Sequence, residues 1–266
     1  MNLKKYRSII AISFGSLLVT MSCDKNPILS DTPANTSGAS SANPSARVTD
    51  YTFDGTEGDP ISLDSTAQWI QNYQTAKASL SAHFFGRKIL ERLLNKNNST
   101  GLRFYYSLDN SANPTLLVKS ANSKGNDLVL LFEARGKKSA VDLNAVKASI
   151  INGSFTDTDA DSVSATVSKN WIDNYYQKNP KGIQAHFFGY EIIKQILSEN
   201  GCVGIRAYYA LNGAGVQQLL LIGVDSNGEN LLPQVTTGNG RVTDGSTNVV
   251  ADMSVPCPSY CGSGTM

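Results

Sequence analysis

The two histidines of the chain both lie in the same five-residue sequence, Ala-His-Phe-Phe-Gly, at positions 82–86 and 185–189. Each is followed 20 residues later by an arginine and then by a tyrosine. The two sets are His83, Arg103 and Tyr105, and His186, Arg206 and Tyr208. An imidazole, a guanidinium and a phenol together supply a general acid or base beside an anion-binding group. This combination suits a hydrolase-like enzyme that uses one or both sets.

A structural role is the alternative for these motifs, and it is preferred here. The Phe-Phe pair after each histidine is typical of a core, and the histidine can bond a neighbouring backbone group. Gly86, if it lies within a helix, costs about 1 kcal/mol relative to alanine, so its recurrence at position 189 indicates close packing. Duplicated enzymes often lose one site, whereas a structural motif must persist in both copies. A binding role ranks second and catalysis third.

Three acidic residues, Asp157, Asp159 and Asp161, have the spacing that opens a calcium-binding loop. The EF-hand pattern then requires glycine at the sixth position and glutamate at the twelfth, where this chain has Ser162 and Ser168. An acidic turn before a helix is therefore the preferred interpretation. We predict no metal site and no cofactor.

The cysteines allow more than one interpretation. Cys257 and Cys261 are close enough to form a small disulfide loop in an oxidising compartment, which leaves Cys202 as a thiol. A bond from Cys202 to either of the other two is an open alternative. A Cys₃His zinc site with His186 is disfavoured, because a continuous helix between His186 and Cys202 would separate them by roughly 20 Å.

The N-terminus has the pattern of an export signal. A basic segment, Met1–Arg7, precedes the weakly apolar run Ser8–Met21, which is too short to span a bilayer but has the length of a secretory signal. It ends at Ser22 and Cys23, and this resembles a bacterial lipoprotein signal in which the cysteine is acylated. Thr20 stands where leucine is usual, as in the looser signals of Bacteroidota lipoproteins. An ordinary secretory leader is the alternative. The predicted signal peptide covers residues 1–22.

Residues 23–50 are rich in Ser, Asn, Ala, Thr and Pro, a composition that favours a flexible tether. Such a tether reaches roughly 30 Å from a lipid on Cys23. We expect a lipid-anchored protein of the cell envelope, at the outer membrane. The sequence does not decide between the periplasmic and the surface side of that membrane, and it does not identify the envelope partner or ligand. The net charge is +1, and it becomes −2 without the three basic residues of the leader. The chain therefore has no basic field for nucleic acid.

The rest of the chain repeats itself. Trp69 and Trp171 are 102 residues apart, and His83 and His186 are 103 apart. We therefore predict one unit at residues 51–152, a second at residues 153–254, and a cysteine-containing tail at residues 255–266.

Periodicity predicts the elements of each unit. In the first unit these are helices at 67–75, after the capping cluster 64–66, and at 83–95, and strands at 102–109, 115–120 and 128–132. On the strand at 102–109, Arg103 and Tyr105 face one side, and Phe104 and Tyr106 face the other. A helix starting at His83 and crossing the first side would bring the histidine to the arginine.

The second unit repeats this pattern, with strands at 218–224 and 231–232, and a loop is predicted at 234–251. A further short helix is predicted at 143–150. The fold class is therefore α+β, with two tandem homologous units in which two helices pack on an antiparallel β-meander.

Three motifs, Trp-Ile-x-Asn-Tyr, Ala-His-Phe-Phe-Gly and Gly-Ile-Arg-x-Tyr-Tyr, together with a Cys-Pro-x-Tyr-Cys tail, resemble small exported proteins of Bacteroidota. This resemblance covers residues 171–261 well; it implies a lineage and no activity. We expect a non-catalytic binding or scaffolding lipoprotein, with the hydrolase-like enzyme as the alternative. An interaction module, the third class, predicts exposed aromatic patches near Tyr106 or Tyr209. Histidines in an open cleft, within reach of their arginine and tyrosine, would favour the enzyme. Histidines buried under the Phe-Phe pair and bonded to the backbone would disfavour it.

Overall fold

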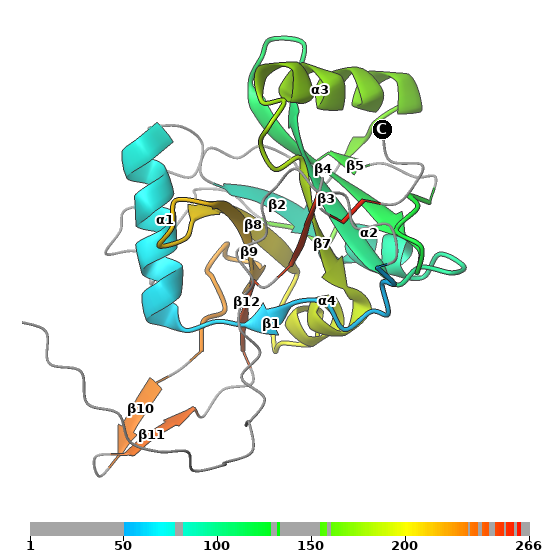
Figure 1. Cartoon of the computed structure of the whole chain (residues 1–266). Coiled ribbons are helices and arrows are strands. Elements are labelled where there is room, and N and C mark those ends of the chain that lie inside the picture. Colours follow the sequence, from blue (N-terminus) through cyan, green and yellow to red (C-terminus); the bar gives the residue numbers. More distant parts are fainter. Residues whose placement is uncertain are drawn as a thin grey trace, which may run out of the picture. The chain divides into compact units, whose positions relative to one another are not determined.

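The computed structural model describes residues 51–77, 82–128, 132–133, 155–158, 161–233, 235–238, 241–244, 248–252, 254–257 and 260–261. Several predictions fall on other residues: the signal peptide, the tether with Cys23, the helix at 143–150, Asp159 and the boundary between residues 152 and 153. The described part belongs to the compact unit formed by residues 42–266. It contains four α-helices and two large antiparallel sheets, which confirms the α+β class (Figure 1).

Sheet A has the strand order β1-β12-β9-β8-β2. Its strands are β1 (Asp59–Pro60), β12 (Val250–Asp252), β9 (Gln217–Val224), β8 (Gly204–Leu211) and β2 (Ala82–Gly86). Sheet B has the order β13-β7-β3-β4-β5-β6. Its strands are β13 (Val255–Cys257), β7 (Ala185–Gly189), β3 (Gly101–Leu108), β4 (Pro114–Ala121), β5 (Phe132–Glu133) and β6 (Asp161–Ser162). The remaining strands, β10 (Val235–Gly238) and β11 (Arg241–Asp244), form a hairpin.

Each sheet combines strands from both halves of the sequence. In sheet A, β1 and β2 of the first half flank the meander β8-β9-β12 of the second. In sheet B, β6 and β7 of the second half flank the meander β3-β4-β5 of the first. The registers correspond, because Phe84 lies opposite Arg206 and Phe187 lies opposite Arg103. The expectation that each half packs its helices on its own meander is therefore wrong.

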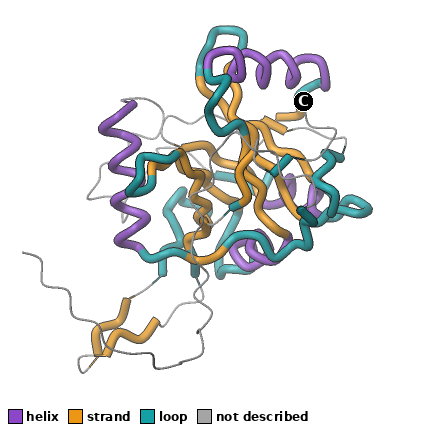
Figure 2. Tube along the Cα trace, in the orientation of Figure 1, coloured by secondary structure: helices purple, strands orange, loops and turns teal. Residues whose placement is uncertain are grey.

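The helices follow the same exchange. Helix α1 (Leu63–Lys77) packs on β8, and α3 (Ala165–Lys178) packs on β3 (Figures 1 and 2). On α1, Ile70 and Tyr73 are buried as predicted. The helix begins slightly earlier than predicted, with the Ser62 hydroxyl accepting a hydrogen bond from the Ser65 N–H.

The Ala-His-Phe-Phe-Gly segments are strands, so the prediction that a helix starts at His83 is wrong. Helix α2 (Arg87–Leu94) begins after β2, and α4 (Tyr190–Leu197) begins after β7. In both segments every residue is buried, and aromatic residues suit such a pleated surface. Gly86 keeps an extended backbone, with φ −67° and ψ 147°, and forms the N-cap of α2.

Three other boundaries also differ from prediction. The predicted loop at 234–251 contains β10 and β11, and β12 begins within it. Leu231 and Leu232 form no strand, although the Leu231 N–H donates to the Gly223 carbonyl. The predicted strand at 128–132 is described only at its two ends, where residue 132 opens β5.

One central core joins the two sheets. It combines the inward faces of both sheets with α2 and α4, and includes Phe85, Phe104, Phe188 and Tyr209. The outward face of sheet A packs against α1, and that of sheet B packs against α3. Because both faces are covered, the strands carry continuous apolar runs such as Leu219–Ile222, in which each residue is 0% exposed.

Candidate functional site

His83 lies on β2 and points into the central core, where it is 2% exposed. Its Nε2 lies 3.0 Å from the hydroxyl oxygen of Tyr209, on the neighbouring strand β8. The two rings meet edge to face, with centroids 5.4 Å apart. Within the described residues, Nδ1 has no hydrogen-bond partner.

His186 occupies the corresponding place on β7 and is 0% exposed. Its Nδ1 lies 2.7 Å from the hydroxyl oxygen of Ser254, which precedes β13. Its ring packs edge to face on Tyr106, with centroids 5.7 Å apart. Nε2 has no hydrogen-bond partner in the part of the chain that is described. The two histidines thus share a position in the fold and differ in their polar partners.

Burial lowers the pKa of His83 to about 3, because the imidazolium would lose its hydration. The same cause lowers the pKa of His186 to about 3. Both imidazoles are therefore neutral near pH 7. A general acid or base needs a pKa close to the working pH and a path to substrate, and both histidines lack these features in the described structure.

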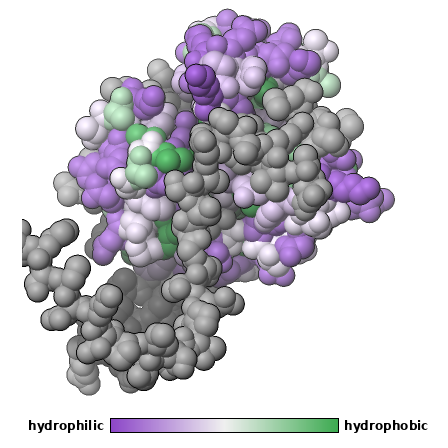
Figure 3. All heavy atoms as spheres, viewed as in Figure 1, coloured by the Kyte–Doolittle hydropathy of each residue, from purple (hydrophilic) through white to green (hydrophobic). Residues whose placement is uncertain are grey.

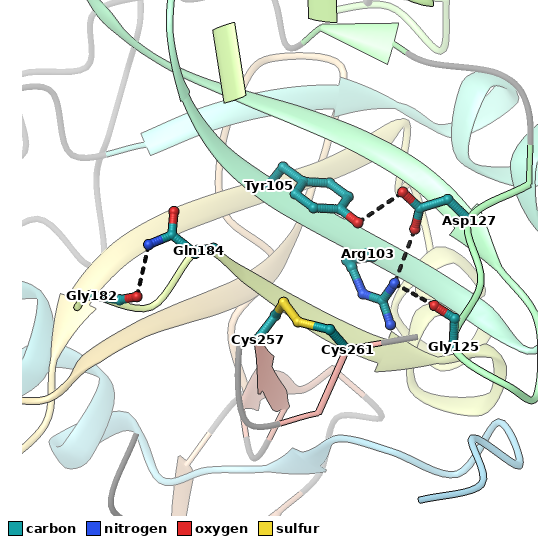
Figure 4. The surroundings of a disulfide bond; sticks show 8 residues. All are labelled: Arg103, Tyr105, Gly125, Asp127, Gly182, Gln184, Cys257 and Cys261. Atoms are coloured by element: carbon teal, nitrogen blue, oxygen red, sulfur yellow. Dashed lines mark hydrogen bonds and ion pairs between the residues drawn. A yellow bond between two sulfur atoms is a disulfide. The ribbon is translucent and has the colours of Figure 1, made fainter. Parts of the chain in front are cut away.

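Arg103 lies on the outward face of sheet B, and its side chain is 0% exposed. Figure 4 shows it directed toward Gly125 and Asp127. Its Nη1 donates to the Gly125 carbonyl at 2.7 Å and to Oδ1 of Asp127 at 3.0 Å. The Tyr105 hydroxyl donates to Oδ2 of Asp127 at 2.8 Å, and Lys119 Nζ lies 3.0 Å from the same oxygen. Burial, followed by the charge of Asp127, raises the pKa of Tyr105. The carboxylate therefore joins two cations and a phenol.

Aromatic rings cover the same guanidinium. The Arg103 Cζ lies 5.4 Å from the ring centroid of Phe53 and 5.7 Å from that of Phe187. Arg103 Nε and Nη2 have no hydrogen-bond partner among the described residues. These rings enclose the guanidinium. Its hydrogen bonds to Gly125 and Asp127 connect strand β3 to the loop that follows β4.

Arg206 occupies the matching place on sheet A and is 1% exposed. Its Nη2 donates to the Gly228 carbonyl at 3.1 Å, and its Nη1 donates to Oδ1 of Asn230. The Asn230 amide donates to the Tyr208 hydroxyl at 2.8 Å. Phe155 covers the guanidinium, with Cζ 5.2 Å from the ring centroid. An amide thus stands where sheet B has the carboxylate of Asp127.

The structure therefore separates each histidine from its predicted arginine and tyrosine. Side chains alternate across a strand, so His83 faces the central core while Arg206 and Tyr208 on the adjacent strand face outward. Arg103 and Tyr105 lie in the other sheet, again on its outward face. The predicted faces of β3 are confirmed, but the helix that packs on the Tyr105 side is α3, which carries no histidine. The His/Arg/Tyr site does not form.

A row of four tyrosines crosses the central core instead. Ring centroids are 5.3 Å apart for Tyr73 and Tyr209, 5.4 Å for Tyr209 and Tyr106, and 5.5 Å for Tyr106 and Tyr175. The Tyr106 hydroxyl donates to the Gln218 carbonyl at 3.2 Å, which links sheet B to sheet A. Tyr106 and Tyr209 are 2% and 3% exposed, so these two residues do not form the exposed aromatic patch that an interaction module would require.

Cys257 and Cys261 form a disulfide (Figure 4). Cys202 is a buried free thiol. The disulfide packs with Tyr105 on the outward face of sheet B. Asp157 pairs with Lys88 at 2.9 Å. The described residues contain no group of three or more His, Cys, Asp or Glu side chains placed to hold a metal ion.

Sequence reasoning missed Asp127, Asn230 and Ser254, which complete the polar clusters. A signal for two of them existed, because Asp127 and Asn230 are 103 residues apart and each follows a turn glycine by two residues. Ser254 had no such signal, since its role depends on β13 pairing with β7.

Protein-family models, curated proteins and solved structures give no match to this chain. Among the described residues, no helix has the length and apolar character needed to cross a membrane.

Proposed function

We propose that this chain is a cell-envelope lipoprotein whose folded part acts as a non-catalytic binding or scaffolding module. In this proposal residues 1–22 are a signal peptide, Cys23 carries the lipid, and residues 23–50 form the tether. The folded part descends from a duplicated unit. The matching registers of β2 on β8 and β7 on β3 support that descent.

One observation supports the non-catalytic role above the enzyme. Both histidines face the central core at 2% exposure or less, while both arginines face the outward sides of the sheets. The polar groups that suggested chemistry hold strands and loops together. The hydrolase-like alternative therefore loses its geometric support.

A binding module must offer surface to its partner. The face shown in Figure 3 is mainly hydrophilic over α1 and α3, with small hydrophobic spots. Among the described residues, the large hydrophobic side chains that reach solvent are Tyr176 on α3, Tyr190 on α4 and Val216 before β9, at 44%, 38% and 44% exposure. We expect the partner to contact such positions.

The test places a photo-reactive amino acid at Tyr176, Tyr190 or Val216 in cells that make the full chain. We expect palmitate labelling, recovery with membranes and a discrete cross-linked adduct. Cys23→Ser should lose the label and the membrane recovery. A folded His83→Gln/His186→Gln variant should keep the adduct, because it retains the outer surface. Unchanged fractionation of Cys23→Ser, or no adduct from any of the three positions, would contradict the proposal.

A further inference from the structure

Glu199 is a buried carboxyl in the turn that follows α4, and it is 2% exposed. Its Oε1 accepts a hydrogen bond from the Val249 N–H at 2.8 Å. Its Oε2 has no hydrogen-bond partner within the described residues and lies against β9 at Gly223, where an added side chain would overlap it. The carboxyl is therefore clamped between a helix end and a sheet.

This environment disfavours a negative charge. Within the described structure a single N–H donor replaces the hydration of the carboxylate, and the carbonyl end of α4 has a partial negative charge. Arg87 of α2 is near, but its Nε donates to the Cys202 carbonyl at 3.0 Å and its Nη2 donates to the Leu197 carbonyl. Burial raises the pKa of Glu199 to about 8.

Among the described residues, the other groups around this carboxyl bring no compensating charge. Cys202, on the same turn, donates its thiol hydrogen to the Gly204 carbonyl at 3.2 Å. The nearest parts of β9 and of the segment entering β12 are Gly223 and Val249, which are uncharged. Proton loss from Glu199 therefore leaves an anion that gains stability mainly by reaching water.

Val249 is the residue directly before β12, and β12 holds the edge of sheet A together. On one side it pairs with β9, with Val250 opposite Ile222. On the other it pairs with β1, and the Ile61 N–H donates to the Val250 carbonyl at 2.8 Å. A disturbance at Val249 is thereby transmitted to the strand that leads into α1.

We propose that Glu199 is a proton-dependent latch on this edge of sheet A. The protonated carboxyl accepts from Val249 and keeps β12 and β1 on β9. The ionised carboxyl moves toward water, releases Val249 and allows β12 and β1 to separate from β9. Rising pH favours opening, because the closed form keeps its proton up to about pH 8 whereas a carboxyl that has reached water ionises near its usual pKa of 4.5. Opening exposes an edge of β9 to a partner strand.

Hydrogen exchange on the full chain between pH 6.5 and 9.5 tests the latch. Rates in peptides covering residues 59–61 and 249–252 are corrected for the intrinsic base-catalysed rate. We expect their protection to fall by up to about tenfold per pH unit as the pH rises toward 8, and to level off above 8, where the closed form is ionised as well. In Glu199→Gln, which keeps the acceptor oxygen and cannot ionise, protection should not change with pH. The matched control, Glu229→Gln at an exposed site, should behave as wild type.

A second measurement uses the unaltered protein. Carbon-13 NMR of glutamate-labelled chain should show a carboxyl carbon titrating near pH 8. The proposal is overturned if all glutamates titrate below pH 6, or if wild type and Glu199→Gln lose protection in parallel. It is equally overturned if residues 59–61 and 249–252 keep constant protection in the wild type up to pH 9.5.

Discussion

The hydroxyl oxygen of Tyr209 lies 3.0 Å from Nε2 of His83, although 126 residues separate the two in sequence. The contact exists because β2 of the first half completes the meander that contains β8 of the second. It places a titratable ring in the middle of the central core, where its protonation state affects the stability of the fold.

Acid should therefore destabilise the protein through His83 and His186. Their pKa values fall from 6.5 to about 3 on folding, so between these values the unfolded chain binds more protons. The contribution is complete above pH 6.5 and is lost as the pH falls toward 3. Each histidine adds a slope of up to about 1.4 kcal/mol per pH unit. Urea unfolding from pH 7.5 to 3.5 measures this.

The control for that prediction is His83→Gln/His186→Gln, which removes both titrating groups. Its unfolding free energy should vary less steeply between pH 6.5 and 3.5 than that of wild type. Equal slopes for the two proteins would show that carboxylates alone cause the acid dependence.

The Asp127 and Asn230 positions form a matched pair of tests. Asp127→Asn leaves Arg103 and Lys119 without their carboxylate and should destabilise by about 2 kcal/mol. Asn230→Asp gives Arg206 the partner that Arg103 has and should stabilise by about 1 kcal/mol. Chemical denaturation at pH 7 measures the unfolding free energy of both variants. Shifts of the same sign would show that a carboxylate at this position does not stabilise the buried arginine.

Gly101 and Gly204 should not tolerate alanine. A methyl group at Gly101 would overlap the Phe188 carbonyl oxygen, and one at Gly204 would overlap that of Phe85, so the paired strands would be forced apart. We expect a loss of about 3 kcal/mol for either variant by chemical denaturation. Gly182→Ala is the control, because its methyl would meet Asn179 at ordinary distances of 3.4 and 3.5 Å. A loss of unfolding free energy no larger than that of Gly182→Ala would show that the paired strands can move apart to accept the methyl group.

The exchange of strands predicts that the two halves stay together after the chain is cut. A protease site introduced between residues 134 and 154 separates them covalently. Because each sheet contains strands from both halves, the cut protein should elute as one species. A denaturing gel confirms that cleavage is complete. Separate elution of two folded fragments would contradict the observed pairing.

Loss of the Cys257–Cys261 disulfide should act locally. The residues are four apart, and closing so short a loop contributes about 2 kcal/mol. Cys257→Ser/Cys261→Ser should lower the melting temperature and raise hydrogen exchange at Ala185–Phe187, the residues that β13 pairs with. A reductant should lower the melting temperature of wild type only. If the reductant lowered the melting temperature of the variant equally, its effect on wild type would not come from the Cys257–Cys261 disulfide.

The sequence was informative where one strand could be judged alone. The alternation of Arg103 and Tyr105 with Phe104 and Tyr106 predicted the two faces of β3, and both are confirmed. The helix faces at Ile70 and Tyr73 were found in the same way. In each instance the period of a single element decides which side is buried.

The prediction failed where a short apolar run fits two structures. Residues 82–86 lie directly before the apolar stripe of α2, so periodicity extended the helix over a buried strand. The choice of partner was also ambiguous. Gly-x-Arg-x-Tyr-Tyr occurs in both β3 and β8, so local pattern does not tell which of them β2 joins. The first error put each histidine on the same side as its arginine, and the second placed β2 and β7 in the wrong sheet.

The pairing of β2 with β8 also has a consequence for how the chain is made. The ribosome delivers residues 82–86 long before residues 204–211, so sheet A stays incomplete until most of the polypeptide has emerged. Long-range pairing of this kind slows folding. During synthesis the side chains of Phe84 and Phe85 therefore stay exposed to solvent until the second half of the chain has been made.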